Sequence, residues 1–320
     1  FSQAMIANER IDVFVDAAEV ERSDELLRFI DFSIGGVANS AGAWTPRGTP
    51  GANLLGPTTS SREPSVFAPN EGGIIRGSTL LLAFARANAS NKYEIWMTEI
   101  GLGSDASPGT GYAVLLPGDD VNGCEELRDP SIIALGPDPT AEGVGVLLFF
   151  TCEPTGTTPA WIGAAHLTYQ LATSHYELAR VHRELLTSGI GAYAEQGVLS
   201  PEVIVTGTTT GGLRLRVWFL ARSSSGRIRV AFAFGEVDEL VVPVLSPFGG
   251  NPILDPEDPI LGAPCPLGCS IGSLGVMRTT DATGHWGERS YVFLIERSVF
   301  LAGGVDHQLI PLRQPRPNGG

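Results

Sequence analysis

One hairpin pattern, two apolar strands joined by a short polar turn, recurs five times along this chain of 320 residues. The five copies span residues 11–35, 79–101, 144–168, 213–236 and 291–312. Their centres are 66 to 75 residues apart, at Val15, Phe84, Phe150, Leu220 and Ile295. A pattern that repeats at a nearly fixed spacing is typical of a repeat architecture, in which each copy forms one structural unit. The chain is therefore expected to fold as a series of five similar units.

A second, shorter strand pattern stands before most of the hairpins. It reads EPSVFA at 63–68, DPSIIA at 129–134 and SPEVIV at 200–205, with a weaker copy at 270–277. The prolines of the first three copies are 66 and 71 residues apart, which matches the spacing of the hairpins. Weaker apolar segments follow the hairpins, as at 112–117, 176–182 and 240–245. Four short strands in about 65 residues are typical of a blade of a β-propeller.

The side-chain pattern within the strands also favours an all-β fold. Arg214 and Arg216 alternate with apolar residues, as expected in a half-buried strand. Residues 146–150 are apolar throughout, which is typical of a strand covered on both faces. The stretch 175–189 has roughly helical spacing and fits either a helix or an irregular outer strand. We therefore predict a five-bladed β-propeller of four-stranded antiparallel blades.

The whole chain is expected to form one propeller domain. Its blades are predicted at roughly 1–55, 56–120, 121–195, 196–262 and 263–320. The first and last blades look incomplete, so residues 1–6 either form a shortened inner strand or complete the last blade, unless residues are missing at both ends. Because an unpaired strand invites pairing with another chain, self-association through the end blades is a further expectation.

Charge and hydropathy narrow the range of partners. The formal net charge is −14, and an acidic surface argues against a nucleic-acid partner, whose phosphates need basic side chains. No apolar run approaches the roughly 18 residues expected of a membrane-spanning helix. The 40 glycines and 23 prolines fit many short strands joined by turns. Neither a nucleic acid nor a membrane span is therefore expected.

The four cysteines indicate an oxidising compartment. Cys124 precedes one predicted strand and Cys152 ends the next antiparallel strand, so their thiols would meet at one end of a hairpin. Cys265 and Cys269 share a short loop rich in proline and glycine and could also form a bridge. Four unpaired buried thiols are the alternative. The chain begins at Phe1 without a leader, so either a targeting segment was removed or the chain is a fragment, and both are compatible with export. Because disulfides persist in exported proteins, we expect a secreted or cell-surface protein.

Carboxylates recur at the start of the short strands. In a propeller each inner strand lines the central channel, so the residue just before it lies at one mouth of that channel. Glu63, Asp129 and Ser200 hold this position in successive units. Two carboxylates in one pocket are what glycoside hydrolysis needs, because one protonates the leaving oxygen and the other attacks or activates water. The alternative role for Asp129 is to anchor its strand by accepting hydrogen bonds from nearby backbone N–H groups.

The five-unit repeat and the segment RDPSII at 128–133 resemble the glycoside hydrolase superfamily of arabinanases, xylosidases, invertases and levansucrases. In that family the corresponding aspartate stabilises the transition state or tunes the acid, so the resemblance implies this role for Asp129. The family also carries a glutamate two residues before a proline in a later blade, where this chain has Leu199. Glu202 lies beyond that proline, and strand alternation points it elsewhere. Asp129, Glu63 and Glu202 are thus the catalytic candidates of a set that is not intact.

Aromatic residues occur nearly once per unit and offer faces on which sugar rings stack. Trp44 and Trp286 are predicted in loops and are candidate saccharide platforms, with Arg128 as a third candidate for substrate binding. The other tryptophans, Trp96, Trp161 and Trp218, are expected to pack between blades. His285 is similar to a channel histidine that some family members use near a bound cation, but its place before a strand fits that role poorly.

No cofactor is predicted. Calcium prefers several oxygen ligands, and segments 118–126 and 255–259 are its candidates, although neither matches a twelve-residue EF-hand loop. Cysteine and histidine spacings suitable for zinc do not occur, nor do phosphate-binding or dinucleotide-binding motifs.

Two functions compete on this evidence. The missing glutamate favours a secreted, non-catalytic module with a carbohydrate-binding, adhesive or structural role. The alternative is a glycoside hydrolase that cleaves arabinosyl, xylosyl or fructosyl linkages with carboxylates at the channel mouth. An oligosaccharide or polysaccharide is the expected partner in the hydrolase and in the binding module. Paired carboxylates about 5 to 9.5 Å apart in an open pocket would favour hydrolysis.

Overall fold

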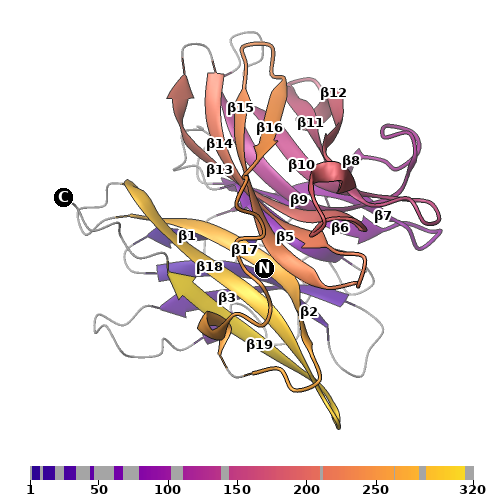
Figure 1. Cartoon of the computed structure of the whole chain (residues 1–320). Helices are drawn as coiled ribbons and strands as arrows, with labels where there is room; N and C mark the ends of the chain where they lie inside the picture. Colours follow the sequence, from indigo (N-terminus) through magenta and orange to yellow (C-terminus); the bar gives the residue numbers. More distant parts are fainter. Residues whose placement is uncertain are drawn as a thin grey trace. The chain divides into compact units, whose positions relative to one another are not determined.

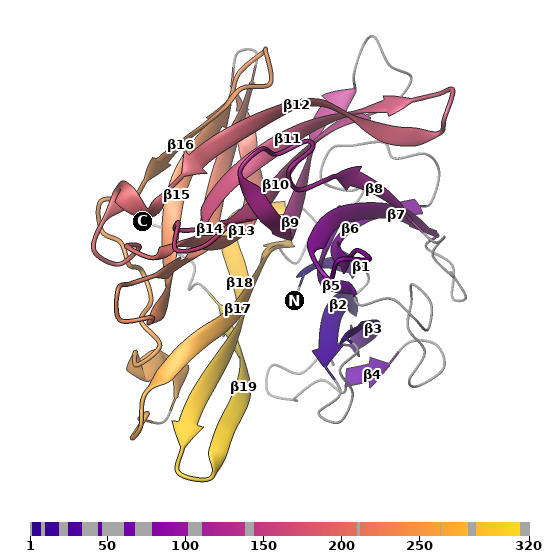
Figure 2. The same ribbon diagram turned by 90° about the vertical axis from the view of Figure 1, so that its right-hand side faces the viewer.

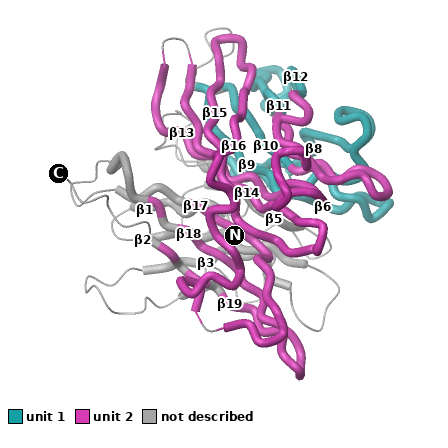
Figure 3. Tube along the Cα trace, viewed as in Figure 1, with its two compact units in different colours: residues 1–150, 165–181 teal, residues 151–164, 182–320 magenta. Residues whose placement is uncertain are grey.

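The computed structural model describes residues 2–7, 10–18, 25–33, 44–46, 61–67, 79–101, 111–137, 144–209, 212–262, 264–280 and 286–313. By its internal contacts the chain divides into two compact units (Figure 3). The first comprises residues 1–150 and 165–181, and the second comprises residues 151–164 and 182–320. The described residues form antiparallel β-sheets joined by turns and two short 3-10 helices.

Five sheets are present in the described part of the chain, and each holds its strands in chain order (Figure 1). The first contains β1 (Ser2–Ala7), β2 (Arg10–Ala18), β3 (Glu25–Ser33) and β4 (Trp44–Pro46). The second contains β5 (Ser61–Phe67), β6 (Thr79–Ala87), β7 (Tyr93–Gly101) and β8 (Tyr112–Leu115). The third contains β9 (Cys124–Pro137), β10 (Val144–Pro154), β11 (Trp161–Gln170) and β12 (His175–Leu186).

The two remaining sheets lie in the second unit. The fourth contains β13 (Gly197–Thr209), β14 (Gly212–Arg222), β15 (Ile228–Val237) and β16 (Pro243–Pro247). The fifth contains β17 (Cys269–Thr280), β18 (Trp286–Leu301) and β19 (Gly304–Arg313). The 3-10 helices span Ser188–Ile190 and Pro259–Leu261.

The repeat read from the sequence is confirmed at the level of strands. All five predicted hairpins form, as β2–β3, β6–β7, β10–β11, β14–β15 and β18–β19. The short pattern before the hairpins forms the first strand of its sheet in β5, β9, β13 and β17. Of the two alternatives for residues 175–189, the strand is correct, because most of this stretch is β12.

Residues 2–7 belong to the first sheet. Strand β1 pairs with β2, with Ile6 opposite Ile11 and Ala7 opposite Arg10, so residues 2–7 are the first strand of the first sheet. The alternative, in which these residues complete the last sheet, is therefore wrong. The fifth sheet has three strands in the described part of the chain, and the residues after Arg313 lie outside it.

Neighbouring sheets of the first unit pack through their first strands. Strand β5 lies against β1, β2 and β3, and β9 lies against β5, β6 and β7. Phe84, Ile95 and Met97 are fully buried between them. Burial of each such side chain contributes about 1.5–3 kcal/mol. The apolar runs of these strands therefore form the core that holds the first unit together.

The second unit has a core of its own between the fourth and fifth sheets, whose strands Figure 2 shows in chain order. Trp218 of β14 is at its centre, with ring centroids 5.0 Å from Tyr291 and 5.2 Å from Phe232. Leu199, Ile271 and Ile295 complete the contact from three different strands. The expectation that Trp218 packs between blades is thus confirmed.

Among the described residues, no helix has the length and apolar character that crossing a membrane requires.

Candidate functional site

A one-residue β-bulge recurs in the first strand of the sheets. In β5 the interruption lies between Arg62 and Ser65, which pair with residues only two apart on β6. In β13 it lies between Leu199 and Glu202, which pair with Leu220 and Trp218. Strands β1 and β17 carry equivalent register shifts. Such bulges re-aim side chains and are enriched next to active sites.

Two copies of the predicted motif coincide with these bulges. Glu63 lies inside the interruption of β5, and Ser200 lies inside that of β13. Asp129 has φ of 48° and Ser200 has φ of 49°, although each precedes a proline. A non-glycine residue rarely adopts positive φ, and a following proline favours extended backbone. The motif therefore marks a strained backbone position, where such strain costs about 1–3 kcal/mol and clusters at functional sites.

The bulge of β13 is supported by a buried side chain of β10. The backbone N–H of Ser200 donates to Oγ1 of Thr151 at 2.9 Å, and Thr151 is fully buried. A bulge leaves a backbone donor outside the strand ladder, and burying such a donor without an acceptor is unfavourable. Thr151 thus stabilises the left-handed backbone of Ser200.

Asp129 and Arg128 are half-buried in β9. The guanidinium of Arg128 lies 5.0 Å from the ring centroid of Tyr93 in β7, at cation–π distance. Glu125 of the same strand forms an ion pair with Lys92. Roles of Asp129 in catalysis and of Arg128 in substrate binding stay predictions.

Glu202 lies on the core side of the fourth sheet. Because directly paired residues share a face of an antiparallel sheet, Glu202 is on the face of Trp218, and Leu199 is on that same face opposite Leu220. In an unbroken strand, residues three apart would point to opposite faces, so the bulge changes the alternation here. Glu202 is 9% exposed.

The tryptophans proposed as platforms are placed differently from the prediction. Trp44 begins β4 and Trp286 begins β18, so both stand in strands and not in loops. Strand pairing explains the difference, since Trp44 pairs with Phe32 and Trp286 pairs with Thr280. The side chains of Trp44, Trp286 and Glu63, and all of His285, lie outside the described residues.

The disulfide predictions are confirmed. Cys265 and Cys269 are bonded to each other, and Cys124 and Cys152 are also disulfide-bonded. None of the four thiols is free.

Each of the two calcium candidates has carboxylates that are held by protein partners. Asp255 accepts from Arg229 Nε at 2.8 Å and pairs with Arg227. Burial raises the pKa of Asp255, but hydrogen bonds from Arg229 and Glu257 N–H, with the charges of both arginines, outweigh it and hold this pKa below its ordinary value. Asp120 Oδ2 accepts from Leu116 N at 2.7 Å. Among the described residues, no three histidine, cysteine, aspartate or glutamate side chains are grouped for a metal ion.

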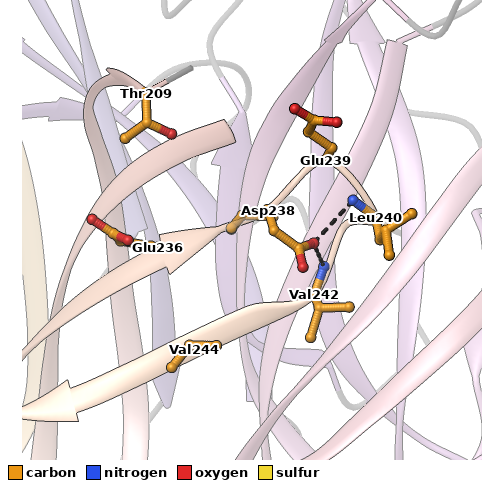
Figure 4. A pocket seen from close by; sticks show the side chains of 8 residues that line it. Thr209, Glu236, Asp238, Glu239, Leu240, Val242 and Val244 are labelled. Atoms are coloured by element: carbon orange, nitrogen blue, oxygen red, sulfur yellow. Dashed lines mark hydrogen bonds between the residues drawn. The ribbon is translucent and has the colours of Figure 1, made fainter. Parts of the chain in front are cut away.

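A hollow of about 550 Å³ lies in the fourth sheet, where Thr209 ends β13 and a turn joins β15 to β16 (Figure 4). Glu236, Asp238 and Glu239 contribute carboxylates, and Thr209 lines the wall. Asp238 Oδ1 accepts from the N–H groups of Leu240 and Val242 at 2.9 and 2.8 Å, so it closes the β15–β16 turn. Thr209 and Ser200 are at opposite ends of β13, roughly 30 Å apart at about 3.3 Å per residue. The hollow is thus distinct from the bulge position.

The bulges themselves were missed at the level of sequence. A proline within a sheet is confined to edges, strand starts and bulges. In two copies of the motif, residues before the proline pair with the next strand, as Arg62 precedes Pro64 and Leu199 precedes Pro201, and apolar strand residues follow the proline. That combination was the available signal.

Comparisons with known proteins show which solved structures this fold resembles. No protein-family model matches the chain, and no curated protein matches it. A GH62 hydrolase in complex with xylotriose has a TM-score of 0.58 at 14% identity, covering 98% of this chain and 90% of its own. A thermostable family-43 glycoside hydrolase has a TM-score of 0.52 at 13% identity, covering 99% and 95%. An α-L-arabinofuranosidase from Lactobacillus brevis has a TM-score of 0.53 at 12% identity, covering 97% and 89%.

The fold therefore resembles that of propeller glycoside hydrolases of the arabinanase and xylosidase type, as the sequence indicated. At 12–14% identity the likeness concerns the fold alone.

Proposed function

We propose that this chain is an exported glycoside hydrolase that cleaves arabinosyl, xylosyl or fructosyl linkages in an oligosaccharide or polysaccharide. Its sheets would close as a five-bladed propeller, and their first strands would bring Asp129 and Glu63 to one mouth of the channel. Fold likeness to solved hydrolases over nearly the whole chain supports an enzyme over a non-catalytic module.

The observation that carries the proposal is the backbone of Asp129. Its φ of 48° before Pro130 is a strained conformation that strand formation alone does not require. Aspartate tolerates the left-handed region better than most residues, so the motif combines backbone tolerance with a carboxylate. A half-buried carboxylate on a strand is suited to act on a glycosidic bond.

A second candidate function rests on Ser200. This residue has the same φ and the same place before a proline as Asp129, but it carries a hydroxyl in place of a carboxylate. Leu199 stands where the family has its glutamate. A saccharide-binding propeller without hydrolytic activity would follow if no third carboxylate replaces this group.

An activity screen with matched variants separates the two functions. The full chain is assayed on aryl arabinosides, aryl xylosides and fructans, and saccharide binding is measured by calorimetry. For a hydrolase, Asp129→Asn is expected to lower kcat by about 100-fold or more, with Glu63→Gln also impaired. Ser200→Ala is the matched control at the equivalent positive-φ position before a proline and should retain activity. Asparagine tolerates positive φ as aspartate does, so the variant should keep its melting temperature.

Each outcome decides between the functions. Activity that is unchanged in Asp129→Asn removes this residue from the mechanism. Saccharide binding without hydrolysis in the wild-type chain supports the binding module and contradicts the hydrolase.

A further inference from the structure

The Cys265–Cys269 disulfide lies beside a buried arginine. Arg297 of β18 is 1% exposed, and its Nη2 atom is 2.6 Å from Sγ of Cys265 and 3.7 Å from Sγ of Cys269. Its other donors are held by backbone carbonyls, with Nε 2.9 Å from Pro256 O and Nη1 3.0 Å from Leu261 O. These carbonyls fix the plane of the guanidinium and aim Nη2 at the two sulfurs.

The surroundings of the sulfurs suit the reduced pair as well as the disulfide. A thiolate is a far better acceptor for a guanidinium than a disulfide sulfur, and a cationic neighbour lowers the pKa of a cysteine thiol. Cys269 Sγ lies 3.0 Å from Pro256 O, a carbonyl to which a thiol S–H could donate. The site therefore offers a donor for one thiolate and an acceptor for one thiol.

We propose that Cys265 and Cys269 form a redox-active pair that an external dithiol reduces while the chain stays folded. In the reduced state Cys265 is the nucleophilic thiolate beside Arg297, and Cys269 is the thiol that donates to Pro256 O. The pair would make this loop a site of thiol–disulfide exchange, independent of glycoside hydrolysis.

Access and electron balance fix the order of the steps. Cys265 is half-buried, whereas Cys269 is 7% exposed, so the thiolate of the dithiol attacks Cys265. The Cys265–Cys269 bond breaks, and Cys269 leaves as a thiolate that takes a proton from the solvent. The second thiolate of the dithiol then attacks its own sulfur in the mixed disulfide and releases Cys265 as a thiolate. Two electrons pass to the protein, and the dithiol is oxidised to its cyclic disulfide.

Other charged groups near the pair are engaged or face away. Asp255 and Glu257, on the loop before the disulfide, pair with Arg227. Asp258 Oδ1 accepts from Ile260 N at 3.1 Å.

On the fifth sheet, Glu296 and His307 contact each other at 3.1 Å and lie on the face opposite Arg297, because adjacent strand residues alternate. Asp306 is on the same face as Arg297 and accepts from Gln308 at 2.8 Å. Arg297 is thus the charged group in contact with the sulfurs among the residues described.

The first test uses the full wild-type chain under native conditions. The protein is treated with dithiothreitol, quenched with iodoacetamide at pH 5 to 9, and mapped by mass spectrometry, while circular dichroism follows the fold. Cys265 and Cys269 are expected to be reduced before Cys124 and Cys152, with the circular dichroism unchanged. At pH 6, Cys265 should be alkylated about 10-fold or more faster than free cysteine. Reduction that occurs only on unfolding, or alkylation of Cys265 no faster than free cysteine, would overturn the proposal.

A pair of variants assigns the effect to Arg297. Arg297→Met should slow alkylation of Cys265 at pH 6 by about 10-fold, and Arg297→Lys should restore part of the rate because it keeps the positive charge. If Arg297→Met fails to fold, the pH profile of the wild-type chain still decides. Equal profiles for wild type and a folded Arg297→Met would contradict the assignment.

Discussion

Tyr112, the first residue of β8, shows how a single side chain responds to its surroundings. Its hydroxyl oxygen accepts from the backbone N–H of Tyr176 at 3.0 Å, and its ring stacks on His175 with centroids 3.9 Å apart. Burial raises the pKa of Tyr112 to about 12, and the charge of Glu99 adds to this effect, although the hydrogen bond from Tyr176 opposes it. The protonated phenol is thus part of the folded state.

The raised pKa of Tyr112 makes a prediction at alkaline pH. The pKa in the folded chain, about 12, exceeds the ordinary value of 10.0. The group therefore contributes stability that is fully present below pH 10 and is lost as the pH rises through 12. Ultraviolet titration near 295 nm should show a tyrosine that ionises near pH 12, and Tyr112→Phe should remove this step. The same variant takes away the acceptor of Tyr176 N–H and should lower the free energy of unfolding by about 1–3 kcal/mol.

Tyr193→Phe is the comparison for Tyr112. Burial also raises the pKa of Tyr193, and its hydroxyl accepts from Asn251 at 3.2 Å, so it involves a side-chain amide in place of a backbone donor. Tyr193→Phe should lower the free energy of unfolding by less than Tyr112→Phe does, because the amide of Asn251 keeps a hydrogen bond to Phe232 O at 2.8 Å. An ionisation near pH 12 that persists in Tyr112→Phe and disappears in Tyr193→Phe would contradict the assignment.

At the scale of elements, the bulge of β13 depends on a side chain from another sheet. Thr151 supplies the hydroxyl that accepts from Ser200 N–H. Thr151→Val keeps the shape of the side chain and removes the acceptor, so we expect a loss of about 1–3 kcal/mol in the free energy of unfolding. Denaturant unfolding measures this loss, and amide hydrogen exchange of Ser200 should be faster by about 10-fold, the equivalent of about 1.4 kcal/mol.

Thr151→Ser is the matched control, because it keeps the hydroxyl and removes a methyl group. Its Ser200 amide should exchange at the wild-type rate even if the small cavity lowers global stability. Equal exchange rates in the Val and Ser variants would show that the hydroxyl does not support the bulge.

Strands and bulges also differ in how well the sequence predicts them. The hairpins were predictable because alternation and turns are local signals, as in Leu213–Arg222. Alternation alone did not predict the face on which Glu202 lies. The extra residue in the bulge near Ser200 changes which residues of β13 share a face. Strand β4, which begins at Trp44, has only three residues, too few to show an alternating pattern in the sequence. It is recognised as a strand by its pairing with β3, so the sequence alone predicted a loop there. The positive φ of Ser200 is supported by Thr151 of another sheet, and no local sequence pattern contains such a contact.

At the scale of the whole molecule, the net charge of −14 affects which polysaccharides can approach the surface. An acidic polysaccharide is repelled by a surface of that sign, whereas a neutral one is not. Screening shortens the range of this repulsion from about 30 Å at 0.01 M salt to about 3 Å at 1 M.

If the proposed saccharide function holds, neutral arabinoxylan should be bound or cleaved about 10-fold better than a polymer rich in uronic acids at low salt, and the gap should narrow as salt is added. Neutral xylo-oligosaccharides serve as the control. Their binding or cleavage should change by less than about two-fold across the same range of salt concentration. A preference for the anionic polymer at low salt that fades with added salt would contradict this expectation, because it would require a basic site strong enough to overcome the field of the whole chain.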